Sequence, residues 1–97
     1  MTSEQLASEL AKALEDNKAV DVRTYDVRGK SGITDFFVVA TGAAAPHLKA
    51  LVRELPKAQR LSGEPDSGWV VADYIDVVVH VFSAEARAYY ALEKLWA

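Results

Sequence analysis

Hydrophobic residues recur every three or four positions in two stretches of the chain, and this spacing predicts two amphipathic helices. The first helix is expected to begin after Thr2, because threonine followed three residues later by Gln5 is typical of a capping box, and to fade near Asp16. The second is expected to begin near Pro46 and to break at Pro56, which has no N–H group to donate. The two apolar stripes are Leu6, Leu10 and Leu14, and Leu48, Leu51, Val52 and Leu55.

Four further stretches are rich in β-branched and aromatic residues and predict β-strands. The first alternates, so Val20 and Val22, together with Tyr25 or Val27, are expected to point inward. The second is continuously apolar and fits a strand covered on both faces. The residues from Leu61 to Gly68 contain two glycines and a proline and are expected to form a loop. The predicted strands are residues 20–27, 36–40, 69–72 and 77–82.

A third helix is expected at the C-terminal end, with Ser83 as its cap and Glu85 near its positive end. Its apolar face would contain Tyr89, Leu92 and Trp96. The element order is therefore α-β-β-α-β-β-α, with no repeat and no linker. This order predicts a single α/β (α+β) domain, a mixed sheet with helices packed on it.

The composition is that of an ordinary globular domain: 97 residues, 51% hydrophobic and 26% charged. No apolar run approaches the roughly 20 residues that span a bilayer, and the polar N-terminus does not resemble a signal peptide, so we expect a cytoplasmic protein without membrane contact. The absence of cysteine excludes disulfides and thiolate nucleophiles. The net charge is −3 and the basic residues are dispersed, which predicts little direct nucleic-acid binding and favours a basic protein as partner.

Carboxylates at the predicted strand ends leave one enzymatic alternative, a small metal-dependent enzyme related to nucleotidyltransferases. That chemistry needs two or three carboxylates that converge on a cation. Asp35 is followed by two phenylalanines rather than by a second aspartate, and Asp73 and Asp76 flank a turn, where aspartate is common for local reasons. His80 is expected to be a hydrogen-bonded residue within a strand. We therefore expect no catalytic residue, no cofactor and no metal ligand.

The residues around the last predicted hairpin are the best candidates for a binding surface. Trp69 follows a glycine and is expected at the exposed rim of the sheet, and Tyr74 lies in a turn between Asp73 and Asp76. Aromatic residues bordered by charges are typical of protein-binding hot spots. The same residues also fit simple core packing, and a homodimer that hides Trp69 is a third interpretation.

Five motifs are spread along nearly the whole chain: ITDFFVVATG at 33–42, HLKA at 47–50, WVVAD at 69–73, DVVVHVF at 76–82 and LEKLW at 92–96. With these motifs in the same order and at similar spacing, the chain resembles the Iojap-like ribosomal silencing factors. The resemblance implies one silencing-factor domain over residues 1–97, with a nucleotidyltransferase-like fold that lacks the catalytic carboxylates.

The resemblance also implies a function. Such a factor binds the large ribosomal subunit through that subunit's protein fourteen, a basic protein, blocks joining of the small subunit and represses translation when nutrients are short. The residues expected to face this partner are Trp69, Asp73, Tyr74 and Asp76. The family's turn usually has a glycine where this chain has Ile75, so a tight turn with positive φ is disfavoured here.

Overall fold

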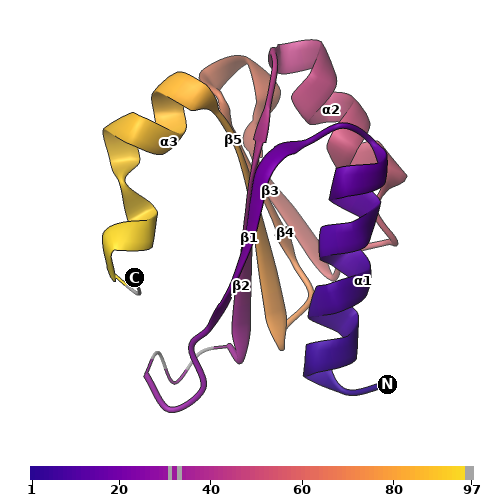
Figure 1. Cartoon of the computed structure of the whole chain (residues 1–97). Helices are drawn as coiled ribbons and strands as arrows, with labels where there is room; N and C mark the ends of the chain where they lie inside the picture. Colours follow the sequence, from indigo (N-terminus) through magenta and orange to yellow (C-terminus); the bar gives the residue numbers. More distant parts are fainter. Residues whose placement is uncertain (31, 33, 96–97) are drawn as a thin grey trace.

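A computed structural model describes residues 1–30, 32 and 34–95 of the chain (Figure 1). Five strands form one sheet in the order β1-β2-β5-β4-β3, and helices lie on both of its faces. The predicted mixed sheet with packed helices is confirmed. The elements are α1 (Ser3–Asp16), β1 (Val20–Asp26), β2 (Phe36–Gly42), α2 (Ala45–Glu54), β3 (Arg60–Glu64), β4 (Trp69–Asp73), β5 (Val77–Ser83), α3 (Ala84–Tyr90) and two short 3-10 helices, η1 (Pro65–Ser67) and η2 (Leu92–Leu95).

Helices α1 and α2 cover one face of the sheet, which we call the closed face. The capping box before α1 is confirmed: Thr2 Oγ1 accepts from the Gln5 backbone N–H at 3.1 Å, and Gln5 Oε1 accepts from the Thr2 N–H at 2.9 Å. Helix α2 ends before Pro56, as predicted. The leucine stripes of both helices pack on the same strands, so this face forms the main core. Its fully buried residues include Leu10, Leu14, Leu48, Leu51, Val38, Val77, Val79 and Val81.

The centre of the sheet is the parallel pair β2 and β5, and the outer pairs are antiparallel. Both central strands are mainly apolar, as expected for strands that have neighbours on both edges and side chains packed on both faces. Their odd and even positions therefore point to two different environments. Phe36 and Val38 point to the closed face, while Val39 belongs to a second, smaller cluster under α3. We call this side the open face.

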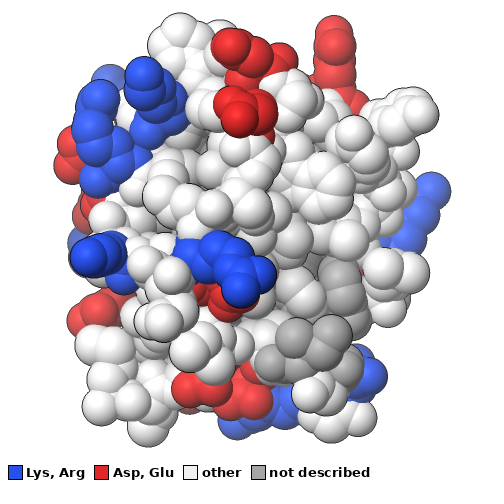
Figure 2. Space-filling model, turned by 180° about the vertical axis from the view of Figure 1, so that it is seen from behind, with Lys and Arg blue, Asp and Glu red and all other residues white. Residues whose placement is uncertain are grey.

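The prediction of a loop from Leu61 to Gly68 is wrong, because residues 60–64 form strand β3 on the edge of the sheet. Every residue of β3 is exposed, so no hydrophobic alternation marks it in the sequence. Gly63 has φ +86, and a Cβ there would lie 2.3 Å from the Trp69 carbonyl oxygen, so its glycine is required by the close pairing with β4. From the β3 side, lysine and arginine side chains gather on one part of the surface (Figure 2).

Two further side-chain predictions are corrected at the sheet edge and in the last helix. Val20 was expected to point inward but is 62% exposed, because the pairing of β1 with β2 shifts between Val20 and Arg23, where Asp21 takes a positive φ. Val22 packs against the core, as predicted. Tyr89 is 82% exposed, because α3 ends at Tyr90 and the chain turns through a left-handed residue into η2. Of its predicted apolar face, Leu92 packs against the smaller cluster, and Trp96 lies outside the described residues.

Candidate partner-binding surface

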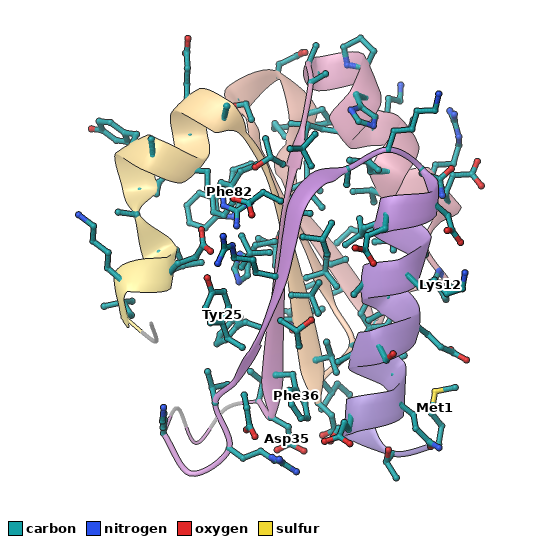
Figure 3. The ribbon with its side chains drawn as sticks, viewed as in Figure 1. Met1, Lys12, Tyr25, Asp35, Phe36 and Phe82 are labelled. Carbon is teal, nitrogen blue, oxygen red and sulfur yellow. The ribbon has the colours of Figure 1, made fainter. Side chains whose placement is uncertain are left out.

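Trp69 lies on the open face of the sheet, where α3 and η2 cover only part of the strands. Alternation along β4 directs Trp69 to the same side as Phe82 of β5, and the two rings stack with centroids 5.1 Å apart. The ring of Tyr90, from α3, lies 4.6 Å away on the indole. Figure 3 shows Phe82 and Tyr25 on this side of the sheet, facing α3 and η2. Trp69 is half-buried, so this residue is partly accessible at the surface.

A hydrogen bond to His80 fixes the plane of this tryptophan. Trp69 Nε1 donates to His80 Nδ1 at 3.1 Å, which confirms the expectation of a hydrogen-bonded strand histidine. Because Nδ1 accepts, the neutral ring carries its proton on Nε2, which has no partner in the described part of the chain. His80 is only 7% exposed, and burial lowers its pKa to about 4. The imidazole is therefore a neutral acceptor for Trp69 at physiological pH.

The turn between β4 and β5 is built around Asp73 and an unusual isoleucine. Asp73 Oδ1 accepts from the Ile75 N–H at 2.7 Å, and the Tyr74 N–H donates to the Val77 carbonyl at 2.8 Å. Ile75 takes φ +73, so the positive-φ turn forms despite a β-branched residue. Its side chain is 59% exposed and therefore makes few packing contacts that could offset the cost of this conformation. The disfavoured conformation at Ile75 is a local strain in this turn.

Tyr74 does not share a surface with Trp69. The two residues are five positions apart on an alternating segment, and Tyr74 packs against the core of the closed face. Its hydroxyl donates to the Pro56 carbonyl, and burial raises the pKa of Tyr74 to about 12. Trp69 is the first residue of β4 and Tyr74 follows its last residue, so the two are about 13 Å or more apart by the rise of a strand.

The four predicted partner-binding residues thus fall into three places. Trp69 and Asp73 are on the open face at the two ends of β4, Tyr74 is on the closed face, and Asp76 is exposed in the turn. The Asp76 carbonyl accepts from the N–H groups of Asp35 and Phe36, at 3.0 and 3.2 Å, which ties the turn to the start of β2. Within residues 1–30, 32 and 34–95, no group of three or more histidine, aspartate and glutamate side chains could hold a metal ion.

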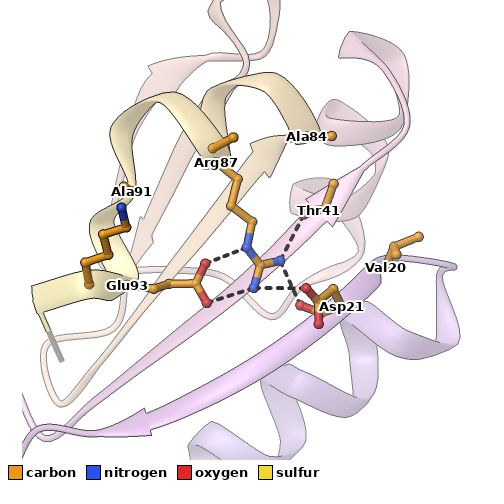
Figure 4. A pocket seen from close by; sticks show the side chains of 9 residues that line it. Val20, Asp21, Thr41, Ala84, Arg87, Ala91 and Glu93 are labelled. Atoms are coloured by element: carbon orange, nitrogen blue, oxygen red, sulfur yellow. Dashed lines mark hydrogen bonds and ion pairs between the residues drawn. The ribbon is translucent and has the colours of Figure 1, made fainter. Parts of the chain in front are cut away.

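A network around Arg87, missed by the sequence analysis, fastens η2 to the sheet (Figure 4). The Arg87 guanidinium donates to both carboxylate oxygens of Glu93, at 2.6 and 2.9 Å, to the Asp21 carbonyl at 2.8 Å and to Thr41 Oγ1 at 2.9 Å. The Arg87 hydrogen bonds lower the pKa of Glu93, which also accepts from the Tyr25 hydroxyl. In the sequence, Arg87 and Glu93 are visible only as two residues of opposite charge in the C-terminal region. The residues that they bind lie up to 68 positions away, so the sequence did not indicate the network.

The same residues line a pocket of about 490 Å³ between β1 and α3. Arg87 already donates to four acceptors there, and its side chain is only 11% exposed. Its donors are thus used within the chain. We assign this network to holding the C-terminal segment in place, beside Trp69 and Phe82. In the described part of the chain, no helix is long and apolar enough to cross a membrane.

Comparison with known proteins places the chain in a family. A family model described as "Ribosomal silencing factor during starvation" matches residues 1–97. The protein named ribosomal silencing factor RsfS in Halalkalibacterium halodurans is 38% identical to this chain, over 99% of this chain and 89% of that protein. The protein of the same name in Bacillus subtilis is 33% identical, over 99% of this chain and 88% of that protein. A crystal structure from Chromobacterium violaceum has 30% identity and a TM-score of 0.93, and covers 99% of this chain and 87% of its own. The chain belongs to the ribosomal silencing factor family.

Proposed function

We propose that this protein represses translation by binding the large ribosomal subunit, through that subunit's protein fourteen, and blocking its association with the small subunit. Family membership supports this proposal, because the relatives are named ribosomal silencing factors and the family description refers to starvation. A mouse relative, 30% identical over 90% of this chain and 43% of its own length, is named for mitochondrial assembly of the ribosomal large subunit. The protein acts in the cytoplasm as a regulator, not as an enzyme.

The observation that carries the proposal is the half-covered open face around Trp69. Val71, two residues along β4 from Trp69, and Val78, opposite Asp73 at the other end of the strand, are half-buried on this face, and the Trp69 ring is oriented by His80. A rigid, partly exposed aromatic residue loses little entropy when a partner covers it. The carboxylates of Asp73 and Asp76 lie at the other end of the same strands, where they would attract a basic protein.

The test is the affinity of purified large subunits for the wild-type protein and for Trp69→Ala. We expect Trp69→Ala to weaken binding ten-fold or more, since a desolvated hot-spot aromatic is worth about 2 kcal/mol or more. Co-sedimentation measures binding, and addition of small subunits to the same mixture measures whether joining is blocked. Light scattering over the same concentrations determines whether the free protein is a monomer or a homodimer.

Tyr89→Ala is the matched control, because Tyr89 is an aromatic residue on α3 that is 82% exposed. It should leave the affinity unchanged. Because Trp69 also packs on Phe82, affinities are compared per folded molecule, with the melting temperature measured for each variant. If Trp69→Ala only lowers the melting temperature, Trp69 is a core residue and the assigned surface is wrong. If the wild-type protein neither co-sediments nor blocks joining, the proposed function is wrong.

A further inference from the structure

The charge of this chain is unevenly distributed. Residues 46–61 carry a net charge of +3, whereas the remainder of the chain carries −6. In the sequence these basic residues are spaced three or four positions apart and form no block, but the end of α2 and the start of β3 bring them to two adjoining hollows of the surface. The basic residues of this segment are Lys49, Arg53, Lys57 and Arg60.

A groove runs through this region, between the C-terminal end of α2 and strand β3. It has a volume of about 510 Å³, and Arg53, Lys57 and Arg60 all line it, together with Tyr74 and Leu61. A smaller hollow of about 200 Å³ adjoins it, because Val52 and Leu61 line both, and Lys49 lies at that end. We call the two together the basic groove. Its walls combine cations with an aromatic ring and exposed aliphatic carbon.

The cations of the basic groove are not used within the described part of the chain. The ion pairs found there involve Lys12, Arg23, Arg28 and Arg87, and none of the four basic-groove residues. All four are exposed. Arg53, in the last turn of α2, is favoured by the helix dipole, but this does not explain Lys57 and Arg60, which lie beyond the helix.

We propose that the basic groove binds the sugar–phosphate backbone of RNA. Unpaired cations release counterions from phosphates, and an aromatic and aliphatic surface between them suits a sugar or a base. This inference rests on the proposed function, because a ribosomal subunit presents RNA beside its basic proteins. Arg60 of the groove pairs in register with Asp73, and paired residues leave the sheet on the same face, so the basic groove borders the acidic turn directly at Arg60. RNA on the groove and a basic protein on the turn would then be neighbours.

The test compares two variants that lose the same charge. The groove variant combines Arg53→Gln, Lys57→Gln and Arg60→Gln; the control combines Lys12→Gln, Lys18→Gln and Lys30→Gln, which lie outside the basic groove. Fluorescence anisotropy with a labelled 20-nucleotide RNA and with a labelled glutamate-rich peptide is measured at 50 and 200 mM salt. Circular dichroism checks that each variant is folded, and co-sedimentation with large subunits is run in parallel.

We expect the groove variant to bind RNA at least ten-fold more weakly and the control to lose less than three-fold. The dependence of log affinity on log salt should also become shallower by about 2, for three lost phosphate contacts at about 0.7 each. Equal losses in both variants, or no RNA binding by the wild-type protein, would overturn the proposal. So would tighter binding of the glutamate-rich peptide, since the occupant would then be an acidic protein. Co-sedimentation of the wild-type protein separates these failures from a failure of the proposed function itself.

Discussion

The two faces of the sheet are packed in different ways. The closed face is covered by two helices of 14 and 10 residues, and its contacts are almost entirely aliphatic. The open face has one helix of 7 residues and a short 3-10 segment, held by Arg87, and its small cluster contains a tryptophan bound to a histidine. Hydrophobic burial is non-directional, whereas hydrogen bonds fix orientation. The closed face therefore supplies stability, and the open face holds particular groups in place at the surface.

The largest effect expected from this comparison is a core substitution on the closed face. Leu10→Ala removes a fully buried side chain from α1, and the lost transfer energy and the cavity together should lower the free energy of unfolding by about 3 kcal/mol. Urea denaturation measures this loss. Ribosome affinity per folded molecule should stay unchanged, in contrast to Trp69→Ala.

The matched control is Ser8→Ala, an exposed position on the same helix, which should change stability by less than about 0.5 kcal/mol. If Leu10→Ala altered affinity per folded molecule as much as Trp69→Ala does, the conclusion that the closed face supplies stability and the open face supplies the binding groups would be wrong.

A smaller effect should appear on the open face as the pH falls. Burial lowers the pKa of His80 from 6.5 to about 4, so the neutral ring is favoured in the folded protein and the unfolded chain binds the proton first. The stability from this group is complete above pH 6.5 and decreases as the pH falls toward 4. At pH 5 the expected loss relative to pH 7.5 is about 2 kcal/mol, measured by chemical denaturation at both values.

His80→Phe provides the comparison, because its ring has similar size and does not titrate. This variant should be less stable at pH 7.5, since Trp69 Nε1 loses its acceptor, but its stability should change less between pH 7.5 and 5. An unchanged pH dependence in His80→Phe would show that other groups cause the acid loss.

The smallest effect concerns the β4–β5 turn, which belongs to neither face. Ile75→Gly should raise the free energy of unfolding by about 0.5–1 kcal/mol, because the left-handed conformation costs a side chain about 1–2 kcal/mol and the entropy cost of glycine cancels only part of this. The urea midpoint measures the change. The control Ile75→Val keeps the branched Cβ and should not raise the free energy of unfolding. A loss of stability in Ile75→Gly would mean that the exposed isoleucine makes contacts worth more than the strain.

Much of the fold could be predicted because its elements depend on residues that are close together in the sequence. The capping box at Thr2 and the leucine stripes require only neighbours in sequence, and the apolar runs of β2 and β5 indicate burial on both sides. Strand β3 could not be predicted, because it is joined to the sheet by backbone pairing alone and its side chains all face solvent.

The candidate site was predicted less well. The period of two along a strand already separates Trp69 from Tyr74, but the sequence analysis grouped them by their chemistry. The partners of Arg87 and the gathering of Lys57 and Arg60 beside Tyr74 depend on how distant segments meet, which no local pattern encodes.

The parallel pairing of β2 with β5 also sets the order in which the protein can be built. Each β2 residue pairs with one 41 positions later in the chain, so the centre of the sheet closes a long loop that contains α2, β3 and β4. Such non-local closure is slow, because its entropy is lost before the contacts form. During synthesis, β2 leaves the ribosome with one edge unpaired until residues 77–83 follow. A nascent chain stopped before that point would carry an apolar strand edge that invites aggregation, and the complete sheet is therefore a late event, finished only with the last fifth of the chain.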